Sequence, residues 1–297
     1  MKYTYYPGCS LHATGVGYDK SIRAVFSRLG HDLVELDDWN CCGATAYTSV
    51  RKTVAYTISA RNLALAARVG DDVVAPCSAC YYVLNRTRKA LAEQPELRDR
   101  VGLALAEAGL EVGDGVPVRH PLEVLLTDVG IDRILAAQTH SIAGFRPACY
   151  YGCQIVRPLS ALDEDPELPT SMERLFSALG AEPVDYPPKV RCCGGMLVAT
   201  FPEVAAELCE ALFGWADERG ANCIVTVCPL CQANLDLLNL APKRRNGSRP
   251  IPVLYFTQII GLAIGCSPAE VGLEHGLTEV TVEVPPLAVT TGGSRHD

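Results

Sequence analysis

"ELDDWNCCGATAY" at residues 35–47 contains two adjacent cysteines followed by glycine, and "PPKVRCCGGMLVA" at residues 187–199 repeats that centre. An offset of 151 residues superimposes the two segments, and the same offset superimposes a Cys-x-x-Cys pair further along each half. The four cysteines that obey this offset in the first half are Cys41, Cys42, Cys77 and Cys80, and their counterparts are Cys192, Cys193, Cys228 and Cys231. The chain therefore contains a duplicated cysteine pattern.

A fifth cysteine precedes each adjacent pair. "YTYYPGC" ends at Cys9 and "PACYYGC" ends at Cys153, so both follow a tyrosine-rich stretch that finishes in glycine. The gap to the pair is 31 residues in the first half and 38 in the second, and the loop-like "LDEDPELPT" at 162–170 can house the difference. Each half reads C-x(31 or 38)-C-C-x34-C-x2-C, which indicates two internal repeats of about 140 residues.

The hydrophobic pattern around the cysteines predicts an α/β fold. "KYTYY" and "RPACYY" are typical of strands, and "YDKSIRAVFSRLG" and "SMERLFSALG" are typical of amphipathic helices closed by glycine. Short strands are expected at "DLVEL" and "EPVDY", and buried strands at "DDVVAP" and "NCIVTV". Strands alternating with helices predict two pseudo-symmetric repeats with short parallel sheets flanked by helices. The cysteine clusters then lie at the carboxyl ends of the strands, where ligands bind in such sheets.

Four segments are expected along the chain. Residues 1–94 form the first Cys-Cys-Gly repeat, 95–146 a helical connector, 147–266 the second repeat and 267–297 a C-terminal extension that is irregular or loosely docked from about residue 279. The most apolar run, "IPVLYFTQIIGLAIGC" at 251–266, is shorter than a bilayer span and is predicted to be a core-packed helix.

Composition excludes several functional classes. The chain has 297 residues, 48% hydrophobic and 20% charged, with a net charge of −8, so neither a nucleic-acid partner nor an anionic membrane surface is favoured. The start "MKYTYYPGCS" lacks the apolar region of a secretory signal, so we expect a cytoplasmic protein without a membrane span. Thiols stay reduced there, and clustered cysteines then indicate metal or redox sites.

Each half has five of these cysteines, which is one more than the common metal sites use as ligands. A structural zinc ion takes four tetrahedral ligands, and a regular four-iron cubane also takes four cysteines. A cluster with several irons could accept adjacent cysteines at different atoms, whereas neighbouring residues rarely reach one ion. Gly43, Gly194 and Gly195 would let the backbone turn tightly beside it. Iron–sulfur binding is the favoured interpretation, and zinc in one half is the lesser alternative.

Several residues near these cysteines have open roles. Cys149 precedes Cys153 by four residues, and His12 follows Cys9 by three, where it could donate a proton to a departing thiolate. An inert thiol and an ordinary loop histidine are the simpler interpretations. Cys209, Cys223 and Cys266 are expected to pack as small apolar side chains. The basic stretch "PKRRNGSRP" at 242–250, with its charges within 243–249, suits a solvated loop, a docking patch or the binding of an anionic tail.

The motifs resemble those of a known family. "YYPGCSLH", "WNCCGA", "APCSAC", "YYGCQIVRP" and "PVLYFTQIIGLAIG" are similar to the B subunit of heterodisulfide reductase. Relatives include glycolate- and lactate-oxidising iron–sulfur subunits and the E-type subunits of some succinate dehydrogenases. The resemblance covers about residues 3–265. It implies a noncubane four-iron cluster in each repeat, with Gly8 and Gly152 beside the ligands. Its ligands would be Cys9, Cys41, Cys42, Cys77 and Cys80 in the first repeat and Cys153, Cys192, Cys193, Cys228 and Cys231 in the second.

The resemblance also implies a function. A catalytic subunit would cleave, or form, a disulfide-type substrate between two [4Fe-4S] clusters. Electrons would come from an iron–sulfur subunit of the heterodisulfide reductase C type and a flavoprotein of the A type. Two clusters suit a two-electron reduction when each passes one electron. The alternative is a non-catalytic electron-transfer or membrane-docking subunit of a succinate or 2-hydroxy-acid oxidoreductase. The disulfide and the reaction direction stay open at this stage.

Overall fold

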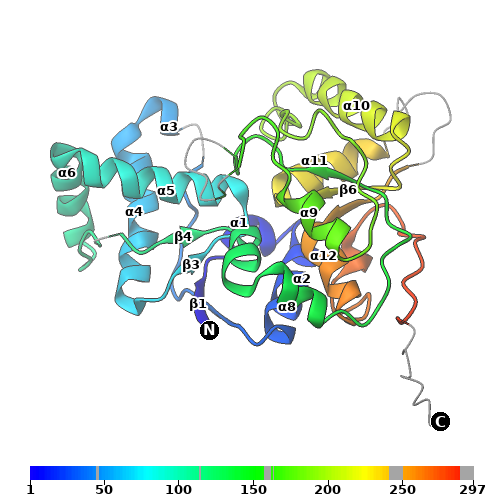
Figure 1. The fold of residues 1–297 in the computed structure, drawn as a ribbon. Helices are drawn as coiled ribbons and strands as arrows, with labels where there is room; N and C mark the ends of the chain where they lie inside the picture. Colours follow the sequence, from blue (N-terminus) through cyan, green and yellow to red (C-terminus); the bar gives the residue numbers. More distant parts are fainter. Residues whose placement is uncertain (45–46, 114, 157–161, 163, 241–249, 288–297) are drawn as a thin grey trace, which may run out of the picture.

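Two parallel sheets form the centre of the chain (Figure 1). The computed structural model describes residues 1–297 except 45–46, 114, 157–161, 163, 241–249 and 288–297. The first sheet has the order β2-β1-β3-β4, and every neighbouring pair is parallel. Its strands are β1 (Lys2–Tyr5), β2 (Asp32–Glu35), β3 (Val73–Val74) and β4 (Val118–Arg119).

The second sheet repeats this arrangement with one strand fewer. It contains β5 (Pro147–Tyr150), β6 (Cys223–Thr226) and β7 (Val253–Tyr255) in sequence order, all parallel. The strand expected at "EPVDY" does not form, although Glu182 N donates to Phe145 O at 2.9 Å and Val184 N to Pro147 O at 3.0 Å. Pro183 has no N–H to donate, which weakens pairing at this edge. The segment nevertheless occupies the place that β2 has in the first repeat.

Helices cover both sheets. In the first repeat α4 ends at Gly70, whose φ of 85° closes the helix in the left-handed conformation that glycine favours. Proline supplies the first position of α6 (Pro95–Ala106), α10 (Pro202–Glu218) and α11 (Pro229–Asn239), where its missing N–H costs nothing. The helices before the second sheet are α1 (Gly8–Leu11), α2 (Val16–Arg28), α3 (Tyr47–Val50), α4 (Lys52–Val69), α5 (Ser78–Glu93), α6 (Pro95–Ala106), α7 (Pro121–Val124), the π-helical η1 (Leu125–Val129) and α8 (Ile131–Ala136).

The remaining helices are α9 (Ser171–Ala178), α10 (Pro202–Glu218), α11 (Pro229–Asn239), α12 (Phe256–Ala263) and the short 3-10 turn η2 (Leu273–His275). The run at 251–266, expected to be one helix, is divided into β7 and α12. All eight residues of α12 are buried, so the run packs in the core as expected. No helix in the described part of the chain is long and apolar enough to cross a membrane.

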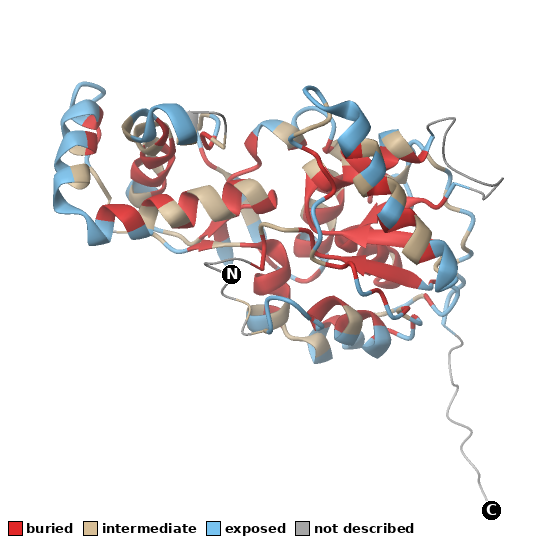
Figure 2. Ribbon diagram, turned by 90° about the horizontal axis from the view of Figure 1, so that it is seen from above, coloured by how far each residue is buried: buried red, intermediate tan, exposed pale blue. Residues whose placement is uncertain are grey.

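The two repeats share their core. Helix α12 of the second repeat lies against α2 of the first, as Figure 1 shows. The rings of Tyr18 and Tyr255 stack at 4.2 Å between centroids, and the hydroxyls of Ser21 and Thr257 are 2.6 Å apart. Figure 2 shows the strands of the second sheet buried throughout. The repeats therefore pack against each other as one body.

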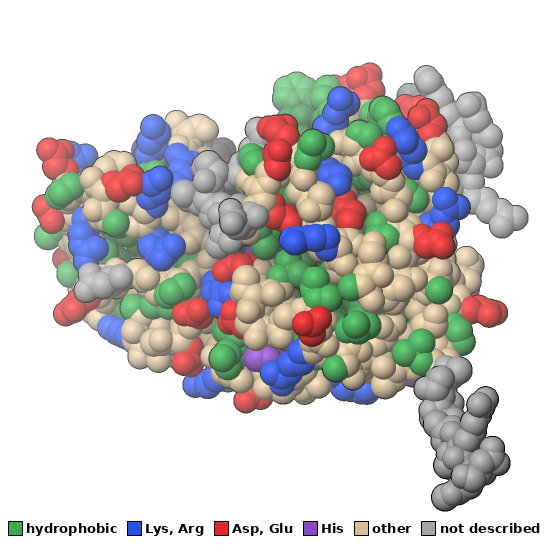
Figure 3. All heavy atoms as spheres, viewed as in Figure 1, with side chains coloured by type: hydrophobic (Ala, Val, Ile, Leu, Met, Phe, Trp, Pro, Cys, Tyr) green, Lys and Arg blue, Asp and Glu red, His purple; other side chains and the backbone are tan. Residues whose placement is uncertain are grey.

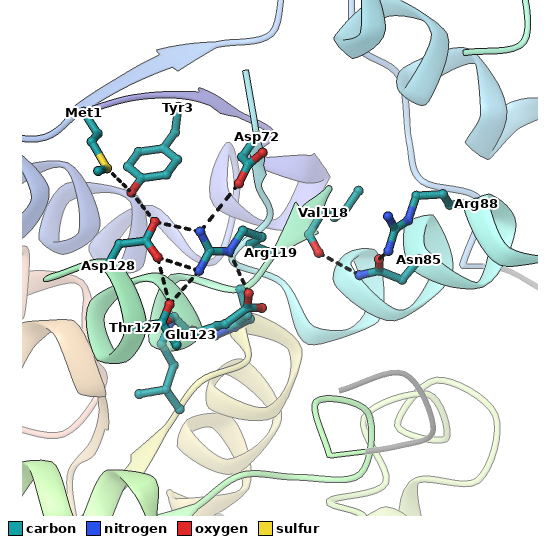
Figure 4. Close-up of polar contacts among 12 residues, drawn as sticks. Met1, Tyr3, Asp72, Asn85, Arg88, Val118, Arg119, Glu123, Thr127 and Asp128 are labelled. Carbon is teal, nitrogen blue, oxygen red and sulfur yellow. Dashed lines mark hydrogen bonds and ion pairs between the residues drawn. The ribbon is translucent and has the colours of Figure 1, made fainter. Parts of the chain in front are cut away.

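The connector contributes more than helices, because β4 completes the first sheet. Arg119 at the end of β4 donates to Asp128 Oδ2 at 2.7 Å and to Glu123 Oε1 at 2.6 Å, and its guanidinium lies 3.5 Å from Asp72 (Figure 4). Tyr3 of β1 donates to Asp128 at 2.7 Å. The guanidinium of Arg119 lowers the pKa of Asp128 from 3.8 to about 2. This network ties the connector to the first sheet.

Replacing Asp128 with asparagine is expected to lower the free energy of unfolding by about 2 kcal/mol at pH 7, because charge-assisted hydrogen bonds are lost. The pKa of Asp128 is lower in the folded chain, so its stabilisation is complete above about pH 4 and is lost as pH falls towards 2. Urea unfolding at pH 7 and pH 3 should show a smaller difference between the two proteins at pH 3. Exposed Asp132 supplies the control, since Asp132→Asn should change neither value. An equal difference at both pH values would contradict the assignment.

Candidate metal centre

The ten repeated cysteines lie just beyond the carboxyl ends of parallel strands. Cys9 follows β1, Cys41 and Cys42 follow β2, and Cys77 follows β3. The strand order reverses between β1 and β3, and such a switch point opens a crevice where α/β sheets bind ligands. The second repeat uses the same positions, with Cys153 after β5 and Cys228 after β6. The topology therefore gathers five thiols at one edge of each sheet.

Within each set several sulfurs lie close to one another. In the first set the neighbouring thiols of Cys41 and Cys80 lower the pKa of Cys42 to about 4. In the second set a hydrogen bond with Cys153 lowers the pKa of Cys192 to about 6. The Sγ atoms of Cys193 and Cys231 are 3.6 Å apart. Thiolates rather than thiols ligate metals, so each set has a sulfur disposed to lose its proton.

The two sets also touch each other. Cys77 and Cys228 are both buried, and the two thiols lie close enough across the repeats for each to shift the pKa of the other. The Cys228 thiol raises the pKa of Cys77, whereas Cys231 and then Cys77 lower the pKa of Cys228. Cys77 in turn contacts Cys80, and Cys228 contacts Cys231. The two Cys-x-x-Cys pairs thus adjoin where the repeats meet.

A tyrosine fixes each Cys-Cys loop. Tyr6, three residues before Cys9, donates its hydroxyl to Asn40 O at 2.7 Å. Tyr150, three residues before Cys153, donates to Arg191 O at 2.6 Å. Each accepting carbonyl belongs to the residue that precedes the adjacent cysteines, and both tyrosine side chains are fully buried. The same hydrogen bond therefore holds the same loop in both repeats.

A single histidine joins the two Cys-x-x-Cys loops. His120 caps α7, and its Nδ1 accepts from Leu122 N at 3.1 Å, so the proton is on Nε2. Nε2 lies 2.8 Å from Pro76 O and 3.1 Å from Val227 O. These carbonyls immediately precede Cys77 and Cys228 and are equivalent under the repeat. Burial lowers the pKa of His120 to about 4, which keeps the ring neutral.

Glycines leave room beside the sulfurs. Gly8 has a φ of 67°, and a Cβ there would lie 3.0 Å from Cys80 Sγ. Gly152 has a φ of 72°, and a Cβ there would lie 3.2 Å from Cys231 Sγ. Gly43 and Gly194, at φ 84° and 74°, turn the backbone directly after each cysteine pair, and Gly195 would place a Cβ 3.4 Å from Cys193 Sγ. Gly8, Gly152 and Gly195 therefore lie against sulfurs, whereas the Cβ positions of Gly43 and Gly194 face α4 and α10.

This donor set fits a group that binds soft thiolates, as iron–sulfur clusters and zinc do. The described residues contain no group of three or more cysteine, histidine or acidic side chains arranged around one metal-ion position. Five sulfurs are available in each set, and Gly8, Gly152 and Gly195 lie against three of the ten. All ten cysteines named from the sequence reach this region, and their use as ligands stays a prediction.

Other predicted residues lie elsewhere. His12 Nε2 is 3.3 Å from Glu35 Oε1, and its ring packs against Trp39 with 5.2 Å between centroids. Cys149 lies in β5 and is fully buried, as is Cys223. Cys209 donates to Cys193 O at 3.2 Å, a contact with the second set that its helical pattern did not indicate. The basic stretch at 243–249 lies outside the described residues.

The sequence interpretation missed Tyr6, Tyr150 and His120. Superimposing Cys9 on Cys153 pairs Tyr6 with Tyr150, so the repeat itself contains a signal for the two tyrosines. His120 has no such signal, because the second repeat supplies Tyr255 at the corresponding helix cap. Its role depends on a contact between segments more than 100 residues apart in the chain.

The fold and this site define a class of protein: a duplicated α/β chain that gathers two adjoining sets of thiols at the ends of its sheets. Residues 3–85 and 148–236 each match the cysteine-rich domain family designated CCG. The chain belongs to that family. The two matches contain all ten cysteines and confirm the expected α/β repeats.

Characterised relatives span nearly the full chain. The chain is 32% identical over 282 residues to the 8-methylmenaquinol:fumarate reductase membrane anchor subunit of Wolinella succinogenes, covering 94% of this chain and 98% of that protein. It is 30% identical over 279 residues to the B subunit of a CoB-CoM heterodisulfide reductase of Methanosarcina acetivorans, covering 92% and 93%. An Archaeoglobus profundus protein named as similar to the heterodisulfide reductase B subunit is 31% identical, covering 91% and 93%. The resemblance to this reductase component is therefore confirmed.

A solved structure shares the fold. A hypothetical protein from Helicobacter pylori superimposes with a TM-score of 0.76 at 17% identity, covering 94% of this chain and 52% of that one. At this identity the match concerns the fold alone. The homologues support a role within an oxidoreductase complex, as a component related to the B subunit of heterodisulfide reductase.

Proposed function

We propose that the chain is the catalytic subunit of a heterodisulfide-reductase-type complex and cleaves, or forms, a disulfide-type substrate between two noncubane [4Fe-4S] clusters. The observation that carries this proposal is the junction of the two Cys-x-x-Cys loops, where the carbonyls preceding Cys77 and Cys228 both lie within hydrogen-bond distance of His120 Nε2 and bring the two thiol sets together. Two independent electron-transfer sites would not need to adjoin. Each five-cysteine set would hold one cluster, and zinc in one half is the lesser alternative.

The chemistry requires two electrons and two protons for each disulfide, which yields two thiols. The bound clusters would supply the electrons one at a time. The protein's own contribution is positioning: Tyr6 and Tyr150 fix the Cys-Cys loops, and His120 fixes the distance between the Cys-x-x-Cys loops. His12 stays an open candidate for a proton donor, and its contact with Glu35 would hold its ring at the edge of the first repeat.

The electrons would arrive from an iron–sulfur subunit of the C type and a flavoprotein of the A type, in the cytoplasm. Neither a ferredoxin cysteine run nor a flavin motif occurs in this sequence, so an external donor is required. The surface drawn in Figure 3 mixes acidic and basic side chains, which agrees with a protein or small-molecule partner rather than nucleic acid.

A second function follows from the Wolinella relative, whose name places it in a menaquinol-linked membrane complex. The chain would then pass electrons to or from a quinone or a 2-hydroxy-acid flavoenzyme and dock to a membrane. This candidate predicts association with liposomes in a flotation assay and no thiol chemistry. Reduction of a disulfide without liposome binding would favour the catalytic subunit.

The cofactor test measures iron, acid-labile sulfide and zinc after anaerobic purification. We expect about eight irons and eight sulfides per chain, since each four-iron cluster contributes four of each. Cys42→Ala and Cys193→Ala should each lose about half of both, because each variant removes a ligand from one set. Cys266→Ala, a buried cysteine outside both sets, is the matched control and should keep all of the iron. One zinc with four irons, or zinc alone, would overturn the two-cluster mechanism.

A further inference from the structure

The C-terminal extension contains a strand-like segment that pairs with no other strand. Residues 279–284 read "EVTVEV", and their three valines pack against the core while the residues between them are exposed. Such alternation is typical of an extended strand. Within the part of the chain that the structure describes, no backbone N–H or carbonyl of residues 279–284 forms a hydrogen bond. The segment therefore has the side-chain pattern of a strand without a hydrogen-bonded neighbour.

Hydrogen bonds hold this segment at both ends. Before it, Leu277 N donates to Asp236 Oδ2 of α11 at 2.7 Å. After it, Leu287 N donates to Thr139 O at 2.8 Å. The backbone between these two anchors runs along the edge of the second repeat, as the red trace at the right of Figure 1. Because both flanks are fixed, a second strand could pair with it at a small cost in ordering entropy.

A groove of about 850 Å³ lies beside the segment. It is lined by the three valines of the segment and, from the region around the end of α12, by Leu262, Cys266 and Leu273. Its described lining also includes three glutamates, all of them exposed, and no lysine or arginine. The groove therefore has an apolar floor and an acidic rim.

The exposed face of the segment is also acidic. Glu279 and Glu283 form no ion pair with any residue that the structure describes. Side chains directly opposite each other on paired strands attract when their charges are opposite and repel when they are alike. A second copy of the segment, paired antiparallel about Thr281, would place Glu279 of one copy beside Glu283 of the other. A strand with basic residues at these positions is therefore favoured over a second copy.

We propose that residues 279–284 are a docking edge to which a partner protein adds an extended segment of alternating apolar and basic residues. The partner's backbone pairs with the free N–H and carbonyl groups of one edge of the segment. Its apolar side chains enter the groove, and its lysines or arginines lie beside Glu279 and Glu283. In such strand addition the main-chain hydrogen bonds provide affinity and the alternating side chains provide specificity. The edge lies outside both cysteine-rich matches and does not depend on the proposed function.

The test adds the peptide acetyl-Lys-Val-Lys-Val-Lys-Val-Lys-amide to the full iron-loaded chain. Hydrogen–deuterium exchange measures the backbone amides of residues 279–284, and anisotropy of a labelled copy of the peptide measures affinity. Alternate N–H groups of a strand face opposite edges, so about three of these amides should become protected when the peptide binds. The control peptide Lys-Lys-Lys-Lys-Val-Val-Val keeps the charge but not the alternation, and it should protect none of them.

Charge reversal tests the choice of partner. The double variant Glu279→Lys with Glu283→Lys should weaken binding of the basic peptide about 10-fold, because two attractive pairs become repulsive. It should strengthen binding of the acidic peptide in which glutamate replaces each lysine. Glu107→Lys, at the exposed end of α6, is the matched control and should change neither affinity.

Four results would overturn the docking edge. The first two are peptide binding without new protection of residues 279–284, and equal affinity of the wild type and the double variant for the basic peptide. Protection already present in the chain alone would show that another part of the same chain covers the edge. Protection that rises with the concentration of the chain would identify a second copy as the occupant instead of a basic partner.

Discussion

Replacing His120 with alanine should lower the free energy of unfolding by about 3 kcal/mol or more, because buried hydrogen bonds and a buried ring are removed together. The carbonyls of Pro76 and Val227 would lose a shared donor, and α7 would lose its cap. Both carbonyls precede proposed ligands, so iron content should fall in both repeats at once. Urea unfolding and iron analysis measure the two effects.

The effect of His120 also depends on pH. Its pKa is about 4 in the folded chain and 6.5 ordinarily, so the unfolded chain binds the proton more tightly. Stability from the neutral ring is complete above the unfolded pKa and is lost as pH falls towards the folded one. Over pH 7.5 to 5 this loss amounts to about 2 kcal/mol.

His120→Gln is the conservative variant, because its amide can donate to either carbonyl while carrying no titrating ring. It should keep more stability and iron than His120→Ala and should reduce the fall in stability between pH 7.5 and 5. His275→Gln, on an exposed turn, should leave that fall unchanged. If His120→Gln loses stability on acidification as steeply as the wild type, the neutral buried ring is not the source.

Gly194→Ala should be the most damaging glycine substitution at the site. Gly194 has a φ of 74°, and a new Cβ would lie 2.9 Å from Ala205 Cα and 3.1 Å from Ala205 Cβ, both on α10. Left-handed backbone alone costs an alanine about 1 kcal/mol, and a clash with helix backbone adds about 1–3 kcal/mol. We expect a loss of about 3 kcal/mol by urea unfolding, with iron lost mainly from the second set.

Two controls separate strain from clash. Gly70 has a φ of 85° with open space around its Cβ position, so Gly70→Ala should show only the backbone cost of about 1 kcal/mol. Gly214 lies within α10 with no neighbour in reach, so Gly214→Ala should stabilise the helix by up to about 1 kcal/mol. Similar losses for Gly194→Ala and Gly70→Ala would show that the close approach of α10 does not matter.

Much of this architecture could be predicted from the sequence, because each motif occurs in both halves and one copy supports the interpretation of the other. The offset between the cysteines, the β-branched runs before Cys77 and Cys228 and the glycine-closed helices all correspond to observed elements. The matches of residues 3–85 and 148–236 agree with the two expected repeats. The division into four segments stays a prediction, because shared packing obscures such boundaries.

Contacts across the repeats could not be predicted in this way. The approach of Cys77 to Cys228 and the bridge through His120 both depend on how one repeat meets the other. The spacing of apolar residues indicates which face of a helix or strand is buried. It does not indicate which other element packs against that face. The two-residue β4 was missed because so short a run has no period. The strand at "EPVDY" was wrong because Pro183 removes a donor from an edge.

The crossing of helices between repeats has a consequence for folding and for ancestry. Helix α12 of the second repeat packs against α2 of the first, while α8, in the connector that completes the first sheet, contacts α9 of the second repeat. Each repeat thus covers a face of the other, in the reciprocal manner of a domain-swapped pair. Cooperative unfolding of the whole chain follows, since neither half retains a closed apolar interior alone. A single-repeat ancestor with this packing would have been a two-fold symmetric dimer, which gene fusion then converted into one chain whose halves were free to diverge.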